Sequence, residues 1–267
     1  MKNLLLISSL ICALLISACN KDNPVIPETS GSFSKVLSFD TAGYTFEMYS
    51  MSGNSLFIGY NDIGFKIYNN GIEKTSGFVK FTPVMYHFTS THSTPVSSNF
   101  LYNTEKKLFT GYVSYIMYSD SGSVWTGTFN YNNELTVSNK PYTVYPRNGI
   151  QMQYWLNTQT SNYYLLTLIE PLEPKTGLNE YKLILHRTTN DFDFYEVDSA
   201  EFYIRPWMPS HGHGSSNNVN PIFKGNGKYE GIVNFTMPGQ WYVYDSIKVN
   251  NNFITPTPSS YFVFDVR

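Results

Sequence analysis

The sequence contains little cysteine and little charge, and the lack of clustered positive charge excludes nucleic-acid-binding proteins. Its 267 residues include two cysteines, and charged residues make up 14% of the chain. The 18 Lys and Arg residues are balanced by 20 Asp and Glu residues, with no basic cluster. Nucleic-acid binding depends on phosphate neutralisation by clustered Lys and Arg. We therefore expect no nucleic-acid partner.

Long apolar runs are also scarce, and the one at the N-terminus predicts a secretory signal. Residues 4–16 are apolar but too few for a stable membrane-spanning helix. The sequence Ile16-Ser-Ala-Cys19 resembles the bacterial lipobox, which implies cleavage before Cys19 and its acylation. We interpret 1–18 as a lipoprotein signal peptide and 19–35 as a lipidated flexible tether. An ordinary signal peptide or a membrane anchor is the alternative.

The lipid anchor would make a membrane the first partner of the protein. Asn20-Lys-Asp22 loosely resembles the export tags of Bacteroidota surface lipoproteins. We therefore predict a lipid-anchored protein of the cell envelope, in the outer membrane, on its periplasmic face or at the cell surface. Because Cys12 leaves with the signal and Cys19 carries lipid, the mature chain would have no thiol for a disulfide or a zinc site. Any metal must then use nitrogen, oxygen or thioether ligands.

What the sequence does have is an all-β composition. Aromatic residues make up 17% of the chain, led by 22 Tyr and 19 Phe, and these residues favour half-buried pleated surfaces. Short alternating runs recur, for example at 44–49, 163–168 and 241–249, separated by Asn- and Gly-rich turn signals. Strands of this size and spacing predict antiparallel sandwiches.

The two halves of the chain look like one unit repeated. Each contains a strand ending in Pro-x-Met, at Met85 and at Met208, followed by a loop with histidines. Next in each half comes a strand that opens with Tyr. A tryptophan then completes the order, Trp125 in the first half and Trp241 in the second. Because the two halves have the same order of motifs, the sequence predicts a tandem repeat.

The repeat divides the chain at a Pro- and Gly-containing segment near residue 145. We predict one sandwich at 36–145, as a diverged repeat, and a second at 146–267. Pro83 should superpose on Pro206, and the two tryptophans should be buried as core residues.

A short His- and Met-containing loop in the second half is the candidate site. Met208-Pro-Ser-His-Gly-His-Gly214 places His211 and His213 two residues apart, so on an extended segment both would face one side. Met237 precedes a Pro-Gly pair typical of a type II turn, which would bring it to a strand end. Thioether and imidazole ligands together suit copper. The alternative is an ordinary loop in which both methionines fill the end of the sandwich.

These residues also carry a family resemblance. The loop at 208–214, Gly227-Lys-Tyr229 and Phe235-Thr-Met-Pro-Gly-Gln-Trp241 resemble the YtkA-like domains of extracytoplasmic bacterial proteins, which are similar to the FixH group. The resemblance covers about 179–249. It implies an immunoglobulin-like sandwich and a role often linked to copper handling, and it implies no enzymatic reaction.

The first half matches the candidate site less well. It offers Met85, His87 and His92 as a weak second site, but it has no His-Gly-His sequence. Four residues before Trp125, where the second half has Met237, stands a serine, and Met117 is out of step. A metal site in this half is therefore the weaker hypothesis.

Signatures of enzymes are missing from the sequence. It contains no Gly-x-Ser-x-Gly elbow and no phosphate-binding glycine loop. We therefore expect no enzyme but a lipid-anchored binding protein that holds a copper ion or assists in copper handling, with a copper-transport or envelope protein as partner. The alternative is a surface lipoprotein that binds glycan or protein through exposed aromatic residues.

Overall fold

The computed structural model describes residues 31–256 and 260–267, and every regular element within them is a β-strand. The predicted signal peptide, Cys19 and most of the predicted tether lie outside these residues. β1 begins at Ser34, so the last two residues assigned to the tether are in a strand. In the described part of the chain, no helix is long and apolar enough to span a membrane.

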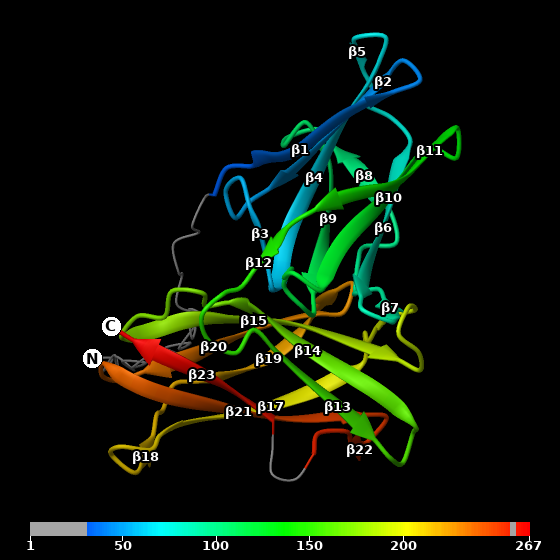
Figure 1. The fold of residues 1–267 in the computed structure, drawn as a ribbon. Coiled ribbons are helices and arrows are strands. Elements are labelled where there is room, and N and C mark those ends of the chain that lie inside the picture. The colour runs from blue at the N-terminus through cyan, green and yellow to red at the C-terminus, as the bar shows by residue number, and fades with distance from the viewer. Residues whose placement is uncertain (1–30, 257–259) are drawn as a thin grey trace, which may run out of the picture.

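The N-terminal lobe is built from the first twelve strands (Figure 1). Its main sheet has the order β1-β2-β4-β9-β8-β6-β10-β11, and β3 pairs with β12 in a short parallel ladder. The strands are β1 (Ser34–Thr41), β2 (Tyr44–Ser50), β3 (Leu56–Phe57), β4 (Gly59–Asn69), β5 (Ile72–Glu73), β6 (Phe78–His87), β7 (Ser90–His92), β8 (Phe100–Asn103), β9 (Leu108–Tyr115), β10 (Ser123–Tyr131), β11 (Leu135–Tyr142) and β12 (Val144–Tyr145).

The C-terminal lobe is a sandwich of two separate sheets. One has the order β13-β14-β15-β20-β19, and the other has the order β18-β17-β21-β22 with β23 also paired to β21. The strands are β13 (Met152–Asn157), β14 (Asn162–Glu170), β15 (Gly177–Thr188), β16 (Tyr195–Glu196), β17 (Ala200–Met208), β18 (His213–Gly214), β19 (Val219–Gly225), β20 (Lys228–Phe235), β21 (Gly239–Val249), β22 (Asn252–Phe253) and β23 (Ser260–Val266).

The N-terminal lobe differs from its neighbour because its two layers belong to one sheet. β8 and β6 are joined only at Phe78–Leu101 and Val79–Phe100, so the sheet folds over at this corner. The layers then face each other, and Phe65 of β4 packs against rings of the opposite layer. The lobe is still a sandwich, which confirms the predicted class of two tandem immunoglobulin-like antiparallel β-sandwiches.

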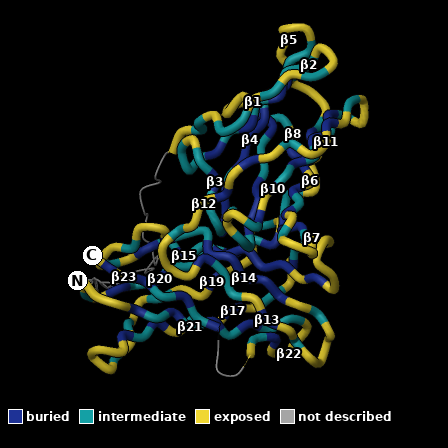
Figure 2. Tube along the Cα trace, in the orientation of Figure 1, coloured by how far each residue is buried: buried dark blue, intermediate teal, exposed yellow. Residues whose placement is uncertain are grey.

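Each lobe has its own apolar core, which appears as dark blue segments inside both lobes in Figure 2. Alternation along the strands produces these cores, since every second residue is buried in β10 and from Trp241 to Ile247 in β21. Trp125 in β10 and Trp241 in β21 are both 0% exposed. Their predicted burial is confirmed.

The pairing register shows that the two lobes repeat one design. Pro83 pairs with Gly127, and Pro206 pairs with Val243, which in each case lies two residues after the buried tryptophan. The predicted correspondence of Pro83 with Pro206 is therefore confirmed at the level of strand register.

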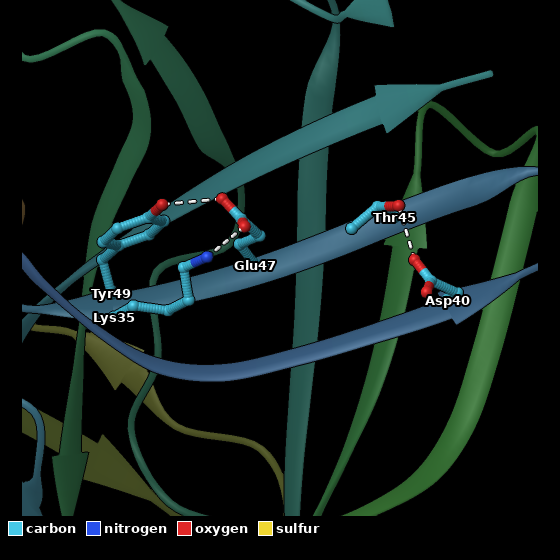
Figure 3. A network of polar contacts seen from close by, with 5 residues as sticks. All are labelled: Lys35, Asp40, Thr45, Glu47 and Tyr49. Carbon is cyan, nitrogen blue, oxygen red and sulfur yellow. Dashed lines mark hydrogen bonds and ion pairs between the residues drawn. The ribbon is translucent and has the colours of Figure 1, made fainter. Parts of the chain in front are cut away.

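Polar side chains cover the outer edge of the N-terminal lobe. β1 ends the sheet, and Lys35 forms an ion pair with Glu47 of β2, which also accepts a hydrogen bond from Tyr49 at 2.6 Å (Figure 3). Further along the same pair, Thr45 donates to Asp40 at 2.5 Å. Charged groups at an edge strand oppose pairing with another chain.

A small polar junction joins the lobes. The Tyr112 hydroxyl donates to Glu196 at 2.6 Å and lies 2.8 Å from Nε2 of His186, while Lys228 donates to the Tyr60 hydroxyl at 2.8 Å. Burial lowers the pKa of His186 to about 3, so its ring is neutral at physiological pH. His186, which stands in mid-strand, thus has a structural role.

Candidate functional site

The predicted loop begins where β17 ends, and it is a tight hairpin. Met208 is the last residue of β17 and pairs with His213 of β18. The N–H groups of His211 and Gly212 donate to the Met208 carbonyl at 3.3 and 2.9 Å. Side chains of directly opposed residues leave the same face of an antiparallel pair. The register therefore puts Met208 and His213 side by side at the end of the sandwich.

His211 is placed differently from the prediction. It lies in the turn and is exposed, so the expectation that His211 and His213 share an extended segment is wrong. The cause is Gly212, whose φ of 65° reverses the chain in a conformation that glycine adopts at little cost. The two imidazole centroids are nevertheless 5.9 Å apart. His211 thus stays near His213, on the solvent side of the turn.

Trp241 is the residue around which the other candidates gather. Its indole N–H donates to the Met237 carbonyl at 3.0 Å, and its ring lies edge-on to His213 with centroids 5.6 Å apart. The Met208 methyl group is only 2.4 Å from the place where a Cβ at Gly239 would stand. The structure thus brings Met208 and His213 together at this end of the sandwich, with the backbone of Met237 beside Trp241. Trp241, which the sequence predicts only as a core residue, is their common neighbour.

The protonation of His213 follows from its hydrogen bond. Its Nδ1 lies 2.9 Å from the Gly214 carbonyl, which can only accept, so Nδ1 donates and, in the neutral ring, Nε2 is the nitrogen with the lone pair. Met208 is buried and Met237 half-buried against the core. One imidazole nitrogen and two thioethers suit a soft cation such as Cu(I). Within 31–256 and 260–267, no three His, Cys, Asp or Glu side chains form a cluster for a harder ion.

The weak candidates of the N-terminal lobe are divided by the structure. Met85 pairs directly with His92 across the β6–β7 hairpin. His87 is engaged elsewhere, since its Nδ1 lies 2.6 Å from the Ser123 hydroxyl and its ring packs against Phe88. Met85 and His92 therefore lie together, whereas His87 has partners of its own.

A second feature of the C-terminal lobe is a row of aromatic residues on the outer face of β17, β21 and β23. We call these residues the aromatic strip: Tyr203, Trp207, Tyr242, Tyr244 and Tyr261. They alternate with buried residues on their strands, and Trp207 lies opposite Tyr242 in the register. The face points away from the N-terminal lobe, which sits against the other sheet (Figure 1).

Neighbouring contacts hold the rings of the aromatic strip in place. Tyr242 and Tyr261 stack with centroids 5.1 Å apart and planes 4° apart. The Arg205 guanidinium lies 4.4 Å from the ring centre of Tyr244, and the Lys248 ammonium lies 5.3 Å from that of Tyr203. Side chains already ordered in this way lose little entropy when a ligand binds. The signal in the sequence for the aromatic strip is the spacing of aromatic residues two apart along β21, which is paired with β17 and β23.

Comparison with known families supports the resemblance seen in the sequence. The YtkA-like family model matches residues 158–244, within the C-terminal lobe. The match includes Met208, His211, His213 and Met237. No curated protein matches the chain.

Several solved surface proteins share a distant likeness in fold. The Escherichia coli adhesin FdeC is 14% identical with a TM-score of 0.28, and the match covers 83% of this chain and 64% of the FdeC chain. This chain therefore spans less than two thirds of the FdeC chain. Domains 5–6 of the S-layer protein SbsC are 11% identical with a TM-score of 0.29, covering 79% and 91%. The Bacteroides ovatus protein SGBP-B, in complex with a mixed-linkage heptasaccharide, is 8% identical with a TM-score of 0.24, covering 92% and 69%.

Proposed function

We propose that this chain is a non-catalytic binding protein of the cell envelope that holds a glycan on the aromatic strip. The observation that supports this proposal is an ordered row of mostly half-buried Tyr and Trp on the sheet face turned away from the other lobe. Tyr and Trp combine an apolar ring with a polar tip, and a sugar ring offers apolar C–H faces beside hydroxyl groups. Arg205 and Lys248 add hydrogen-bond donors between the rings.

The aromatic strip can be tested with paired substitutions. Trp207→Ala and Tyr242→Ala should each weaken binding to a soluble polysaccharide by about 3- to 10-fold, because each removes one stacking surface. Isothermal titration against a panel of soluble glucans, xylans and mannans measures the effect. Tyr154→Ala is the control, since Tyr154 is an exposed tyrosine that is stacked, on Tyr163, but lies in β13. If the control loses as much affinity as the strip variants, or if no polysaccharide binds, the proposal fails.

The envelope location in this proposal depends on the lipid at Cys19. Replacing this residue (Cys19→Ser) should release the protein from membranes, because two acyl chains give firm attachment and the charge-balanced chain offers no basic patch to replace them. Carbonate extraction and fractionation measure the release. Cys12→Ser should change nothing, since Cys12 leaves with the signal. A Cys19→Ser protein that still fractionates as an integral membrane protein would contradict the anchor.

A second candidate function is copper binding at the end of the C-terminal lobe. The observation that favours it is the gathering of Met208, His213 and Met237 around Trp241, with Nε2 of His213 left for a ligand. Met237→Leu nearly conserves volume and should weaken Cu(I) more than Cu(II), because only the thioether prefers the softer ion. A chain that binds no copper in a Cu(I) titration would reject this candidate.

A further inference from the structure

The N-terminal lobe contains a cluster that repeats the candidate site of its neighbour. Met85 lies opposite His92 in the β6–β7 hairpin, as Met208 lies opposite His213 in the β17–β18 hairpin. Both methionines are buried, at 0% and 2% exposure. The same strand register therefore brings a thioether and an imidazole together in each lobe.

The tryptophan of each lobe makes the same two contacts. The ring of Trp125 is edge-on to His92, with centroids 5.5 Å apart, and its indole N–H donates to the carbonyl of Met117 at 2.9 Å. In the C-terminal lobe, Trp241 makes the corresponding contacts with His213 and Met237, at 5.6 and 3.0 Å. Through this backbone contact, Met117 occupies the place that Met237 has in the other lobe.

This equivalence corrects the prediction that the first half lacks a matching methionine. Counting back four residues from Trp125 gives Ser121, but the indole reaches back eight residues to Met117. The intervening residues form a local loop closed by the bridge between Asp120 and Ser123. Loop length varies without moving the strand ends, so spacing along the sequence concealed the match.

The imidazole of His92 has an unused nitrogen. Its Nδ1 lies 2.9 Å from the carbonyl of Ser93, the next residue, as that of His213 does with Gly214. A carbonyl only accepts, so Nδ1 is the protonated nitrogen and Nε2 carries a lone pair. That Nε2 atom is buried and has no hydrogen-bond partner among the described residues. An unpaired buried acceptor is costly and calls for a partner, and here that partner must accept an electron pair or donate a proton.

We propose that the N-terminal lobe binds a soft monovalent cation of the Cu(I) type through Met85, His92 and Met117, so that the chain carries two like sites, one in each lobe. This inference rests on the second candidate function, copper binding in the C-terminal lobe. Both thioethers belong to or pack against the apolar core that holds Trp125, and soft ligands in such surroundings favour Cu(I) over Mg²⁺ or Ca²⁺. His87 has no part in the site because Ser123 engages it.

The test is an anaerobic Cu(I) titration of the lipidated chain in detergent, against a colorimetric Cu(I) chelator of known affinity. The wild-type chain should bind two equivalents. Each lobe is disabled by a pair of substitutions, namely His92→Asn with Met117→Leu or His213→Asn with Met237→Leu. Either pair alone should leave one equivalent, and all four substitutions together should leave none. His87→Ala is the control in the same hairpin and should keep two equivalents.

The outcomes separate this inference from the candidate function on which it rests. One equivalent in the wild-type chain, removed by the C-terminal pair alone, would overturn the N-terminal site and leave copper binding in the other lobe. No bound copper would reject both. The single variant Met117→Leu guards against misfolding, since it nearly conserves volume. It should keep the wild-type near-UV circular dichroism and lower the affinity of one equivalent more than tenfold, and an unchanged affinity would overturn the N-terminal site.

Discussion

Trp241→Ala should lower the free energy of unfolding of the C-terminal lobe by about 3–5 kcal/mol, the cost of deleting a buried large aromatic side chain. Trp241 is 0% exposed, packs against Phe235 and donates its indole hydrogen bond to Met237. The cavity would therefore open in the core at the end that carries the candidate site. Urea unfolding followed by circular dichroism measures the loss.

Trp207 provides the matched control for this substitution. It belongs to the outer face of the same sheet, so Trp207→Ala should change the free energy of unfolding by no more than about 1 kcal/mol. Equal losses in the two variants would contradict the assignment of Trp241 to the core and of Trp207 to the aromatic strip.

Stability of the C-terminal lobe should fall as pH rises above neutrality, because of Asp245. This residue is 0% exposed, and it accepts a hydrogen bond from Tyr181 at 2.9 Å while its Oδ1 has no partner among the described residues. Burial raises the pKa of Asp245 to about 8. The folded state therefore keeps a proton that the unfolded state releases near pH 4, and the stability present at low pH is lost as pH rises toward 8.

His186 determines the pH range in which this loss can be seen. Burial lowers the pKa of His186 to about 3, so below about pH 6.5 the unfolded state binds a proton at His186 that the folded state does not. That linkage makes stability rise with pH and offsets the effect of Asp245 between about pH 4 and 6.5. From pH 6.5 to 8, the effect of Asp245 outweighs what remains of the His186 effect, and the free energy of unfolding should fall by roughly 1–1.5 kcal/mol.

Urea unfolding at pH 6.5, 7.2 and 8.0 tests this expectation, with Asp245→Asn as the comparison. The variant cannot ionise at this position, so its unfolding free energy should stay level while that of the wild-type protein declines. Parallel curves for the two proteins would show that Asp245 is not the source of the pH dependence.

Much of the fold could be predicted from local sequence patterns. Alternation identified the strands, and the order Pro-x-Met, His loop, Trp identified the repeat, because strand register preserves these positions in both lobes. The sequence could not show that both layers of the N-terminal lobe come from a single folded sheet, since this depends on the short pairing of β8 with β6. Nor could it show the junction, where Tyr112 meets His186 and Glu196 from 74 and 84 residues away.

The candidate site was predicted in part, for a similar physical reason. Residue types and turn signals in the sequence mark Met208, His213 and Met237, and the fold places them at one end of the C-terminal lobe. His211 was misplaced because Gly212 reverses the chain, and Met117 was missed because a loop lengthens its distance from Trp125. The aromatic strip was foreseen only as exposed aromatic residues, since alternation separates two faces without showing which face the rest of the molecule leaves open.

Mapping of backbone amide chemical shifts tests the central claim most directly. The spectrum is recorded with and without the polysaccharide that binds most tightly in the titration panel. We predict that the largest changes fall in β17, β21 and β23, at and beside Trp207, Tyr242 and Tyr261. Changes concentrated at the lobe junction around Tyr112 and Glu196, or in the N-terminal lobe, would contradict the assignment of glycan binding to the aromatic strip.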